Sequence, residues 1–352
     1  MNKRWMFLLF VVALGHSVGG AAPTRPVLRT ENVVLVTLDG LRWQELFGNG
    51  RTTGARKRAV QAQQRHALLP FLWDSVAVRG QLYGNRAYGN VVGLANYQRF
   101  SYPGYQEVLS GAADPRIQNN APVDNPHRTV LDFLSQEPAY HGSVAAFASW
   151  EVLGHILNGT SGRFPVNAGW QAAIGPDLTP GEQRLNATLG HCPRLFSAVR
   201  ADTLTFAYAL EYLKRAQPRV LYLAFGETDE QAHAGRYTDY LDAAHQADQC
   251  LGRLWAYLQA TPRYRNKTTL LITTDHGRGY GPWWPRHGLQ IPGSGQTWLA
   301  VIGPDTPPTG EQRTPGHFSQ NQVAQTLAAL LGTTYPAPPQ AGSAIAPMLP
   351  AP

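Results

Sequence analysis

Apolar runs alternate with segments of helical periodicity along most of this chain. Continuous apolar, β-branched runs predict buried strands at Asn32–Leu38, 143–148, 219–225, 268–274 and 297–303. Apolar residues at helical spacing predict helices at 64–78, 128–134, 201–216, Tyr237–Ala260 and 320–331. This alternation is typical of an α/β fold, with a mostly parallel central sheet and helices on both faces.

The two ends of the chain differ from its middle. Lys3 and Arg4 precede an apolar run at 5–14, and small residues follow at 19–22. This order is typical of a secretory signal peptide, and the run is too short for a transmembrane helix. We therefore expect residues 1–22 to be removed on export to the periplasm or the medium. Residues 23–334 are expected to form a single domain, and the Pro/Ala-rich tail 335–352 to lie on the surface as extended coil.

Composition and charge exclude some classes of protein. Hydrophobic residues make up 43% of the chain and charged residues 15%, which is a globular composition. The net charge of +7 is spread as single arginines, without the clustered basic residues of a nucleic-acid surface. Cys192 and Cys250 form either a disulfide or two free thiols, and both possibilities are open.

Three of the predicted strands end in an acidic residue. Asp39 follows the first strand, Asp229 lies shortly after the strand at 219–225, and Asp275 follows the strand at 268–274. In an open α/β sheet, ligands bind outside the carboxyl ends of the strands. Three acids that converge there predict a site for positively charged ions.

Histidines next to two of these acids indicate the kind of ion. His233 follows Asp229 at i+4, so both side chains lie on one face of a helix, and His276 follows Asp275 directly. Each motif alone is common by chance. Together, carboxylate and imidazole are typical of zinc, because calcium and magnesium prefer oxygen ligands.

Ser101 is the candidate nucleophile. It stands at the start of S-Y-P-G-Y-Q-E-V-L-S-G, where Pro103 suits the first turn of a helix and Gly111 suits its end. A helix N-terminus favours an anion through its dipole and its free N–H groups. The alternative is that Ser101 is an ordinary helix cap.

These motifs resemble the alkaline phosphatase superfamily over most of the chain. The order is the same: an acid after the first strand, a nucleophile before a helix, Asp-x-x-x-His, Asp-His and a late His. The segment from Ser101 is similar to the nucleophile helix of nucleotide pyrophosphatase/phosphodiesterase-type members. The resemblance implies an alkaline phosphatase-like fold, and it makes residues 23–334 a catalytic domain.

The resemblance also implies a set of site residues. One divalent ion would be held by Asp229, His233 and a late histidine, either His287 (preferred, in R-H-G-L-Q) or His317. The second would be held by Asp39, Ser101, Asp275 and His276. An Asn past the nucleophile would donate to the phosphoryl group, and Asn120 is preferred to Asn119.

The implied function is an exported hydrolase of small-molecule phosphate esters. It would use two divalent ions, zinc or alternatively manganese, and a phosphoserine intermediate on Ser101. A phosphodiester or phosphonate hydrolase is an alternative, as is a sulfatase. However, Tyr105 stands where the sulfatase motif (C/S)-x-P-x-R has Arg, and Gly40 stands where a second acid is usual.

An inactive metal-binding exported protein is the non-enzyme alternative. Trp43, Trp150, Trp283 and Trp284 either line an apolar pocket near the site or pack in the core.

Overall fold

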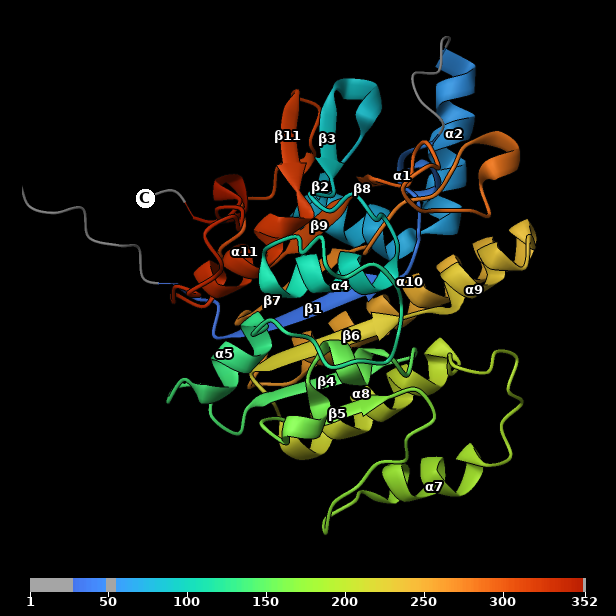
Figure 1. Ribbon diagram of the computed structural model, residues 1–352. Coiled ribbons are helices and arrows are strands. Elements are labelled where there is room, and N and C mark those ends of the chain that lie inside the picture. The colour runs from blue at the N-terminus through green and yellow to red at the C-terminus, as the bar shows by residue number, and fades with distance from the viewer. Residues whose placement is uncertain (1–27, 49–54, 351–352) are drawn as a thin grey trace, which may run out of the picture.

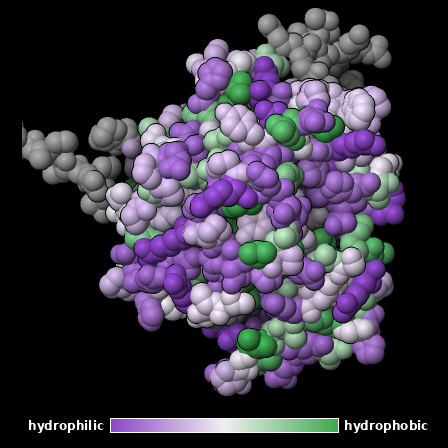
Figure 2. All heavy atoms as spheres, viewed as in Figure 1, coloured by the Kyte–Doolittle hydropathy of each residue, from purple (hydrophilic) through white to green (hydrophobic). Residues whose placement is uncertain are grey.

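The fold is described from a computed structural model, in which residues 28–48 and 55–350 are placed. The expected signal peptide therefore lies outside the described residues. None of the helices within these two ranges is both long and apolar enough to cross a membrane. Among the described residues on the face in Figure 2, apolar side chains are scattered between polar ones, as is usual for a surface in water.

A large central sheet organises the molecule (Figure 1). Its spatial order is β10 (Gly310–Glu311), β2 (Gln81–Tyr83), β9 (Leu299–Ile302), β7 (Thr268–Thr273), β1 (Asn32–Leu38), β6 (Val220–Phe225), β4 (Val144–Ala148) and β5 (Val166–Ala168). The strands from β7 to β5 pair in parallel, and β9 is antiparallel to both of its neighbours. The predicted mostly parallel sheet is confirmed.

Helices cover both faces of this sheet, as predicted (Figure 1). Val33 and Leu35 point to one face, while Val34 and Val36 point to the other. The first face carries α4 (Ser101–Ser110), α5 (Val130–Gln136), α6 (Leu153–Ile156) and α11 (Val323–Leu330). The second face carries α1 (Trp43–Phe47), α7 (Pro180–Leu189), α8 (Asp202–Ala216), α9 (Glu227–His233) and α10 (Tyr237–Ala260). Because both faces of the central strands are buried, their sequences are continuously apolar.

Two predicted elements are interrupted in the structure. The helix expected at 64–78 is α2 (Ala55–Leu68), a π-helical turn (Leu72–Val76) and α3 (Ala77–Arg79). Pro70 causes the break, because proline disfavours helical backbone in the residue before it. The strand expected at 297–303 is divided between β9 and β8 (Gln296–Thr297). β8 lies in a second small sheet with β3 (Asn90–Gly93) and β11 (Gly316–Ser319).

The C-terminal segment corrects another expectation. Residues 335–350 are irregular except for a 3-10 turn at Ala346–Met348, and they are not wholly on the surface, because Tyr335, Ile345 and Met348 are buried in the core of the first face. The Tyr335 hydroxyl also donates to the Arg128 carbonyl. Of the two alternatives for the cysteines, the structure has the free thiols: Cys192 and the buried Cys250 are not joined by a disulfide.

Candidate active site

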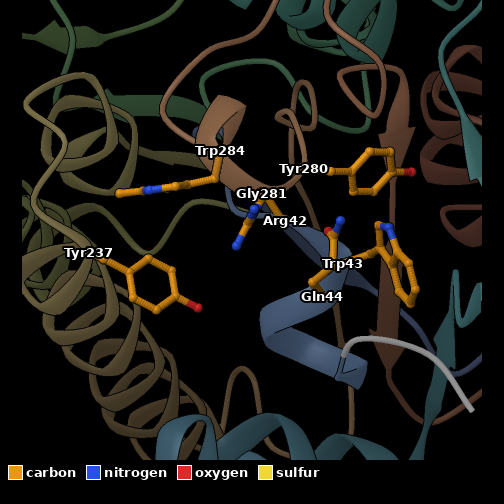
Figure 3. Close-up of a pocket in the computed structure, with 7 residues that line it drawn as sticks. All are labelled: Arg42, Trp43, Gln44, Tyr237, Tyr280, Gly281 and Trp284. Carbon is orange, nitrogen blue, oxygen red and sulfur yellow. The ribbon is translucent and has the colours of Figure 1, made fainter.

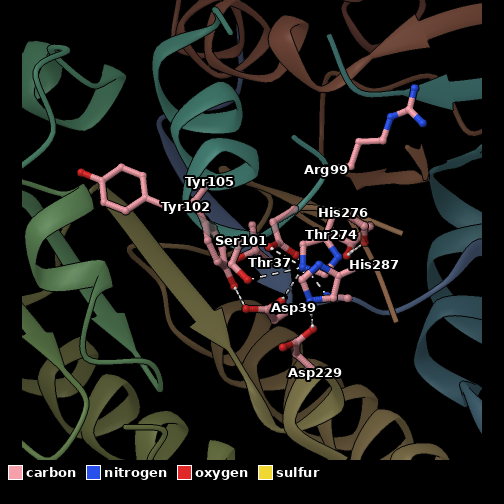
Figure 4. A network of polar contacts seen from close by, with 12 residues as sticks. Thr37, Asp39, Arg99, Ser101, Tyr102, Tyr105, Asp229, Thr274, His276 and His287 are labelled. Atoms are coloured by element: carbon pink, nitrogen blue, oxygen red, sulfur yellow. Dashed lines mark hydrogen bonds and ion pairs between the residues drawn. The ribbon is translucent and has the colours of Figure 1, made fainter. Parts of the chain in front are cut away.

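The three predicted acids meet at one end of the central sheet. β7, β1 and β6 are neighbours, and their carboxyl ends lead into Asp275, Asp39 and the helix α9 that carries Asp229. All three side chains are buried. Figure 4 shows Asp39 and Asp229 with Ser101, His276 and His287 at this edge of the sheet. The convergence expected from the strand ends is therefore present.

Gly40 makes the close packing of these acids possible. Its φ of +60° is a left-handed conformation that glycine adopts readily. A Cβ atom there would lie 2.7 Å from Arg278 Nε and 2.8 Å from Asp229 Oδ1. The Gly40 N–H also donates to Asp275 Oδ1 at 3.0 Å, which links the ends of β1 and β7.

Ser101 is the first residue of α4, as predicted, and Gly111 ends that helix with a left-handed φ of +77°. Gly104 lets α4 lie directly against the end of β7, because a Cβ atom there would collide with the Asp275 carbonyl oxygen. Behind it, the buried carboxylate of Glu107 accepts from the backbone N–H groups of Ala95 and Asn96, each at 2.8 Å. Glu107, a residue of α4, thus fixes the backbone of the loop that leads to Ser101.

His276 is the centre of the first cluster of ligands. Its Nδ1 is 2.9 Å from the Gly277 carbonyl oxygen, which can only accept, so the proton is on Nδ1 and the Nε2 lone pair is free to bind a cation. Four oxygen atoms surround this Nε2: Ser101 Oγ at 3.4 Å, Asp39 Oδ1 at 3.4 Å, Asp275 Oδ2 at 3.4 Å and Asp229 Oδ1 at 3.7 Å. All of the residues expected to hold the second ion are therefore together.

Two atoms of this cluster are buried without a hydrogen bond. They are Asp39 Oδ1 and Asp275 Oδ2, the carboxylate oxygens nearest to His276 Nε2. Burial raises the pKa of Asp39 well above its usual range, and the carboxylate of Asp275 raises it further. Burial also raises the pKa of Asp275 to about 7 and lowers the pKa of His276. Unpartnered buried oxygens beside an imidazole lone pair fit a divalent cation, whose charge would stabilise both carboxylates.

A second cluster adjoins the first. His233 Nε2 lies 3.0 Å from Asp229 Oδ2 and 2.9 Å from His287 Nε2. Two nitrogen ligands of a tetrahedral zinc ion are roughly 3.3 Å apart, given Zn–N bonds of about 2.0–2.1 Å. The three ligand atoms therefore fit one ion after a small outward shift. The His233 side chain is 48% exposed, so this cluster is open to solvent on one side.

The structure separates the two candidates for the late histidine. His287 Nε2 faces His233, and its ring stacks on His276 with centroids 4.1 Å apart. His317 lies exposed on β11 in the small sheet and pairs along the strand with Val91. The geometry thus favours His287, as the sequence analysis did.

Asn120, the candidate donor to the phosphoryl group, lies beside the nucleophile at the start of α4. Its side-chain oxygen accepts from the Tyr102 backbone N–H at 2.9 Å, which caps the first turn of α4. Pro103 has no N–H to offer. Few N–H groups of this helix start are therefore free to bind an anion, and the favourable effect of α4 on Ser101 is mainly its dipole. Asn119 accepts from Ala121 within its own turn.

Two side chains of the site were not predicted from the sequence. Arg278 is fully buried, and its guanidinium contacts Asp229 Oδ1 and donates to the Asp229 carbonyl at 3.1 Å. Burial lowers its pKa to about 9, so it remains a cation at neutral pH. Tyr105 donates from its hydroxyl to Asp39 Oδ2 at 2.9 Å. Its spacing of i+4 from Ser101 was a signal, because it places both on one face of α4.

Comparison with known proteins agrees with this geometry. A family model described as Sulfatase matches residues 180–333, a region that contains Asp229, His233, Asp275, His276 and His287. The alkaline phosphatase PafA aligns with a TM-score of 0.65 at 10% identity, over 92% of this chain and 100% of its own. A 2-O GAG sulfatase aligns with a TM-score of 0.58 at 16% identity, over 91% of this chain and 74% of its own.

A phosphonate monoester hydrolase from Silicibacter pomeroyi aligns equally well, with a TM-score of 0.58 at 16% identity, over 92% of this chain and 78% of its own. No curated protein sequence matches the chain. Fold and site together define an α/β protein of alkaline phosphatase-like fold, with two groups of acids and histidines that could hold a metal ion. The resemblance to the alkaline phosphatase superfamily is thereby confirmed, and the structures that share this fold include sulfatases, phosphonate monoester hydrolases and phosphatases.

Proposed function

We propose that this protein hydrolyses phosphate esters, with Ser101 as the nucleophile and two divalent metal ions as cofactors. The observation that carries the proposal is the set of oxygens around His276 Nε2. The Ser101 hydroxyl is one of them, at 3.4 Å, and two others are buried carboxylate oxygens without a hydrogen bond. A hydroxyl group in the same ligand cluster as the acids is the arrangement that activates a serine for attack.

The two clusters suggest how the ions would be held. One ion would bind Asp229 Oδ2, His233 and His287, and the other would bind Asp39, Asp275, His276 and Ser101. The mixture of imidazole and carboxylate favours zinc, with manganese as the alternative. Bound ions of this kind lower the pKa of a hydroxyl group and neutralise charge on phosphoryl oxygens.

The chain's own residues account for the remaining chemistry. Ser101 Oγ gives its proton to water and attacks phosphorus, the new O–P bond forms, and the bond to the leaving oxygen breaks. The leaving group departs as an alcohol after it takes a proton from water. A water molecule then attacks the phosphoserine, phosphate is released, and Ser101 regains its proton. Tyr105 holds Asp39 and Arg278 holds Asp229 throughout, so that the ligands stay in position.

Sulfate ester hydrolysis is the second candidate. The Sulfatase family model and the 2-O GAG sulfatase structure favour it. Two features favour phosphate esters instead. Tyr105 replaces the arginine of the sulfatase motif and uses its hydroxyl to hold Asp39 at 2.9 Å, and Gly40 replaces the second acid. Phosphodiesters and phosphonate esters are further substrates that the same site could accept.

Export of the protein is part of the proposal. It is supported by the pattern of residues 1–22 in the sequence. The zinc ligands and the substrate are independent of it, so a test of the site does not depend on where the protein is found.

The decisive experiment compares three p-nitrophenyl esters: a phosphate monoester, a phosphate diester and a sulfate. Turnover is measured with zinc, with manganese and with a chelator, and Ser101→Ala is assayed beside the wild type. We expect chelator-sensitive cleavage of a phosphate ester that Ser101→Ala lacks. Cleavage of the sulfate alone would establish the second candidate. Metal binding without turnover of any ester would favour an inactive metal-binding protein.

A further inference from the structure

An aromatic cavity of about 510 Å³ opens beside the candidate active site (Figure 3). Its walls include Trp43, Tyr237, Tyr280 and Trp284, and in Figure 3 Arg42 lies between these rings. A volume of this size suits a small organic ligand. Of the tryptophans considered from the sequence, Trp43 and Trp284 thus line a cavity. Trp283 instead packs against Arg286, and Trp150 forms a backbone bridge with Val199.

Short contacts join this cavity to the ligands of the Asp229 cluster. Arg42 Nη1 donates at 3.0 Å to the carbonyl of Gly279, the residue after Arg278, and Arg278 in turn contacts Asp229 Oδ1. Tyr280 is two residues from Arg278, so their Cα atoms are at most about 7.6 Å apart. The cavity is therefore linked through Arg278 to the cluster of Asp229, His233 and His287.

The aromatic walls are held in place by hydrogen bonds. Gln296 Oε1 accepts from Trp43 Nε1 at 2.9 Å and from the Tyr280 hydroxyl. On the other side, Glu45 accepts from Arg42 Nε at 3.0 Å and from the Tyr237 hydroxyl at 3.1 Å. Rings fixed in this way lose little entropy when a ligand binds, because they are already ordered.

Trp284 contacts both an aromatic ring and the arginine of this cavity. It packs edge-on against Tyr237 with centroids 4.9 Å apart, and the guanidinium of Arg42 lies 5.8 Å from its centroid. Tyr280 and Tyr237 are 43% and 44% exposed, so their rings are accessible to a ligand rather than buried in the core. A cavity with accessible aromatic side chains, beside an arginine that is paired with Glu45, favours a flat aromatic ring over a saturated one.

We propose that this cavity binds a planar aromatic leaving group of the substrate. This inference rests on the proposed function, in which Ser101 attacks phosphorus, and it adds that the leaving oxygen lies on the opposite side, toward the Asp229 cluster. The substrate class would then be phosphate esters of alcohols that carry an aromatic ring. The ring enters the cavity, and Trp284 and its neighbours provide the contact.

Binding and turnover are measured with a matched pair of ligands. The binding probes are 2-naphthylmethylphosphonate and its saturated decahydronaphthyl counterpart, which have the same attachment and contain no ester to cleave. Calorimetric titration of the zinc-loaded protein should show roughly 2- to 12-fold tighter binding of the flat ring, the range expected for aromatic contacts beyond their area. The corresponding phosphate esters are assayed for kcat/KM.

Two variants with the same substitution test the residue assigned to the ring. Trp284→Leu keeps apolar bulk but removes the ring and should abolish the preference for the flat ligand. Trp283→Leu changes the neighbouring residue, which is half-exposed and outside the cavity walls, and should keep the preference. Thermal melting of both variants checks that they fold.

The outcomes separate this inference from the function on which it rests. Equal binding of the two ligands by the wild type, or an intact preference in Trp284→Leu, would refute the cavity assignment even if esters are hydrolysed. A ring preference that disappears in Trp284→Leu, together with hydrolysis of the naphthylmethyl ester, would support it. A ring preference without turnover of either ester would refute the leaving-group role alone if p-nitrophenyl phosphate esters are cleaved, and the hydrolase proposal as well if they are not.

Discussion

Tyr105→Phe is the sharpest test of the metal centre, because it removes one hydroxyl group and leaves the ring in place. The Tyr105 side chain is buried, and its hydroxyl donates to Asp39 Oδ2 at 2.9 Å. A hydrogen bond to a charged group contributes about 1.5–3 kcal/mol. Loss of a partner that holds a metal ligand typically lowers metal affinity about 10- to 100-fold. The two magnitudes agree, since a tenfold change corresponds to about 1.4 kcal/mol.

The direction of the pH dependence follows from the same contact. The hydrogen bond from Tyr105 lowers the pKa of Asp39, which burial and Asp275 raise. Its removal raises that pKa further, so protons compete better with the metal ion. The loss of affinity in Tyr105→Phe should therefore grow as the pH falls from 8 to 6.

The assay is a metal titration followed by calorimetry, with bound zinc counted after dialysis. Tyr102→Phe is the matched control: it lies on the same helix, and its hydroxyl donates to the Val123 carbonyl at 2.6 Å instead of to a ligand. We expect the control to bind both ions as the wild type does. If Tyr105→Phe also binds both ions with unchanged affinity at every pH, the assignment of Asp39 as a ligand held by Tyr105 is wrong.

Three further predictions address the rest of the site. The metal-free protein should lose stability as the pH rises from 4 to 7, because the folded state holds a proton on Asp275 up to a pKa of about 7, against 3.8 for an ordinary Asp; greater resistance to urea at pH 8 than at pH 5 would contradict this. Gly104→Ala should push α4 away from the Asp275 carbonyl, lower the free energy of unfolding by about 1–3 kcal/mol and reduce turnover at least about tenfold. Gly190→Ala, with open space around it, should change neither. Urea unfolding and steady-state kinetics compare the two variants. His287→Ala should lose one equivalent of zinc and His317→Ala none, as measured by metal analysis, and the reverse result would exchange their roles.

The main parts of the fold could be predicted because their signals are local. A continuous apolar run such as Asn32–Leu38 can only be stable when both faces are covered, and Tyr237–Ala260 has the period of one helix from end to end. The sequence places an acid after each of three strands, and the carboxyl ends of neighbouring parallel strands lie at the same edge of a sheet. The strand pattern and the positions of the acids together therefore predicted that Asp39, Asp229 and Asp275 meet.

Other features depend on contacts between distant residues, and no local pattern marks them. The C-terminal segment is rich in Pro and Ala, yet Met348 fills a space in the core that only the folded chain creates. Arg278 lies in a glycine-rich loop, where an arginine is usually exposed. Its burial depends on Asp229, which is 49 residues away in the sequence, and on the absence of a side chain at Gly40.

The buried charges of the site bear on the choice between phosphate and sulfate. The cluster contains three acids that are negative when ionised, Asp39, Asp229 and Asp275, and one positive side chain, Arg278. Its net charge without metal ions is therefore −2. Burial of uncompensated charge is costly, so a metal-free protein must take up protons instead. With the Ser101 hydroxyl still protonated, one divalent ion would bring the cluster to neutrality, whereas two would leave a net charge of +2. A phosphate monoester is a dianion at neutral pH and would balance that charge, but a sulfate monoester carries only one negative charge. Two bound ions therefore favour a phosphate monoester as the substrate, and the number of ions that the protein binds is itself evidence on the reaction.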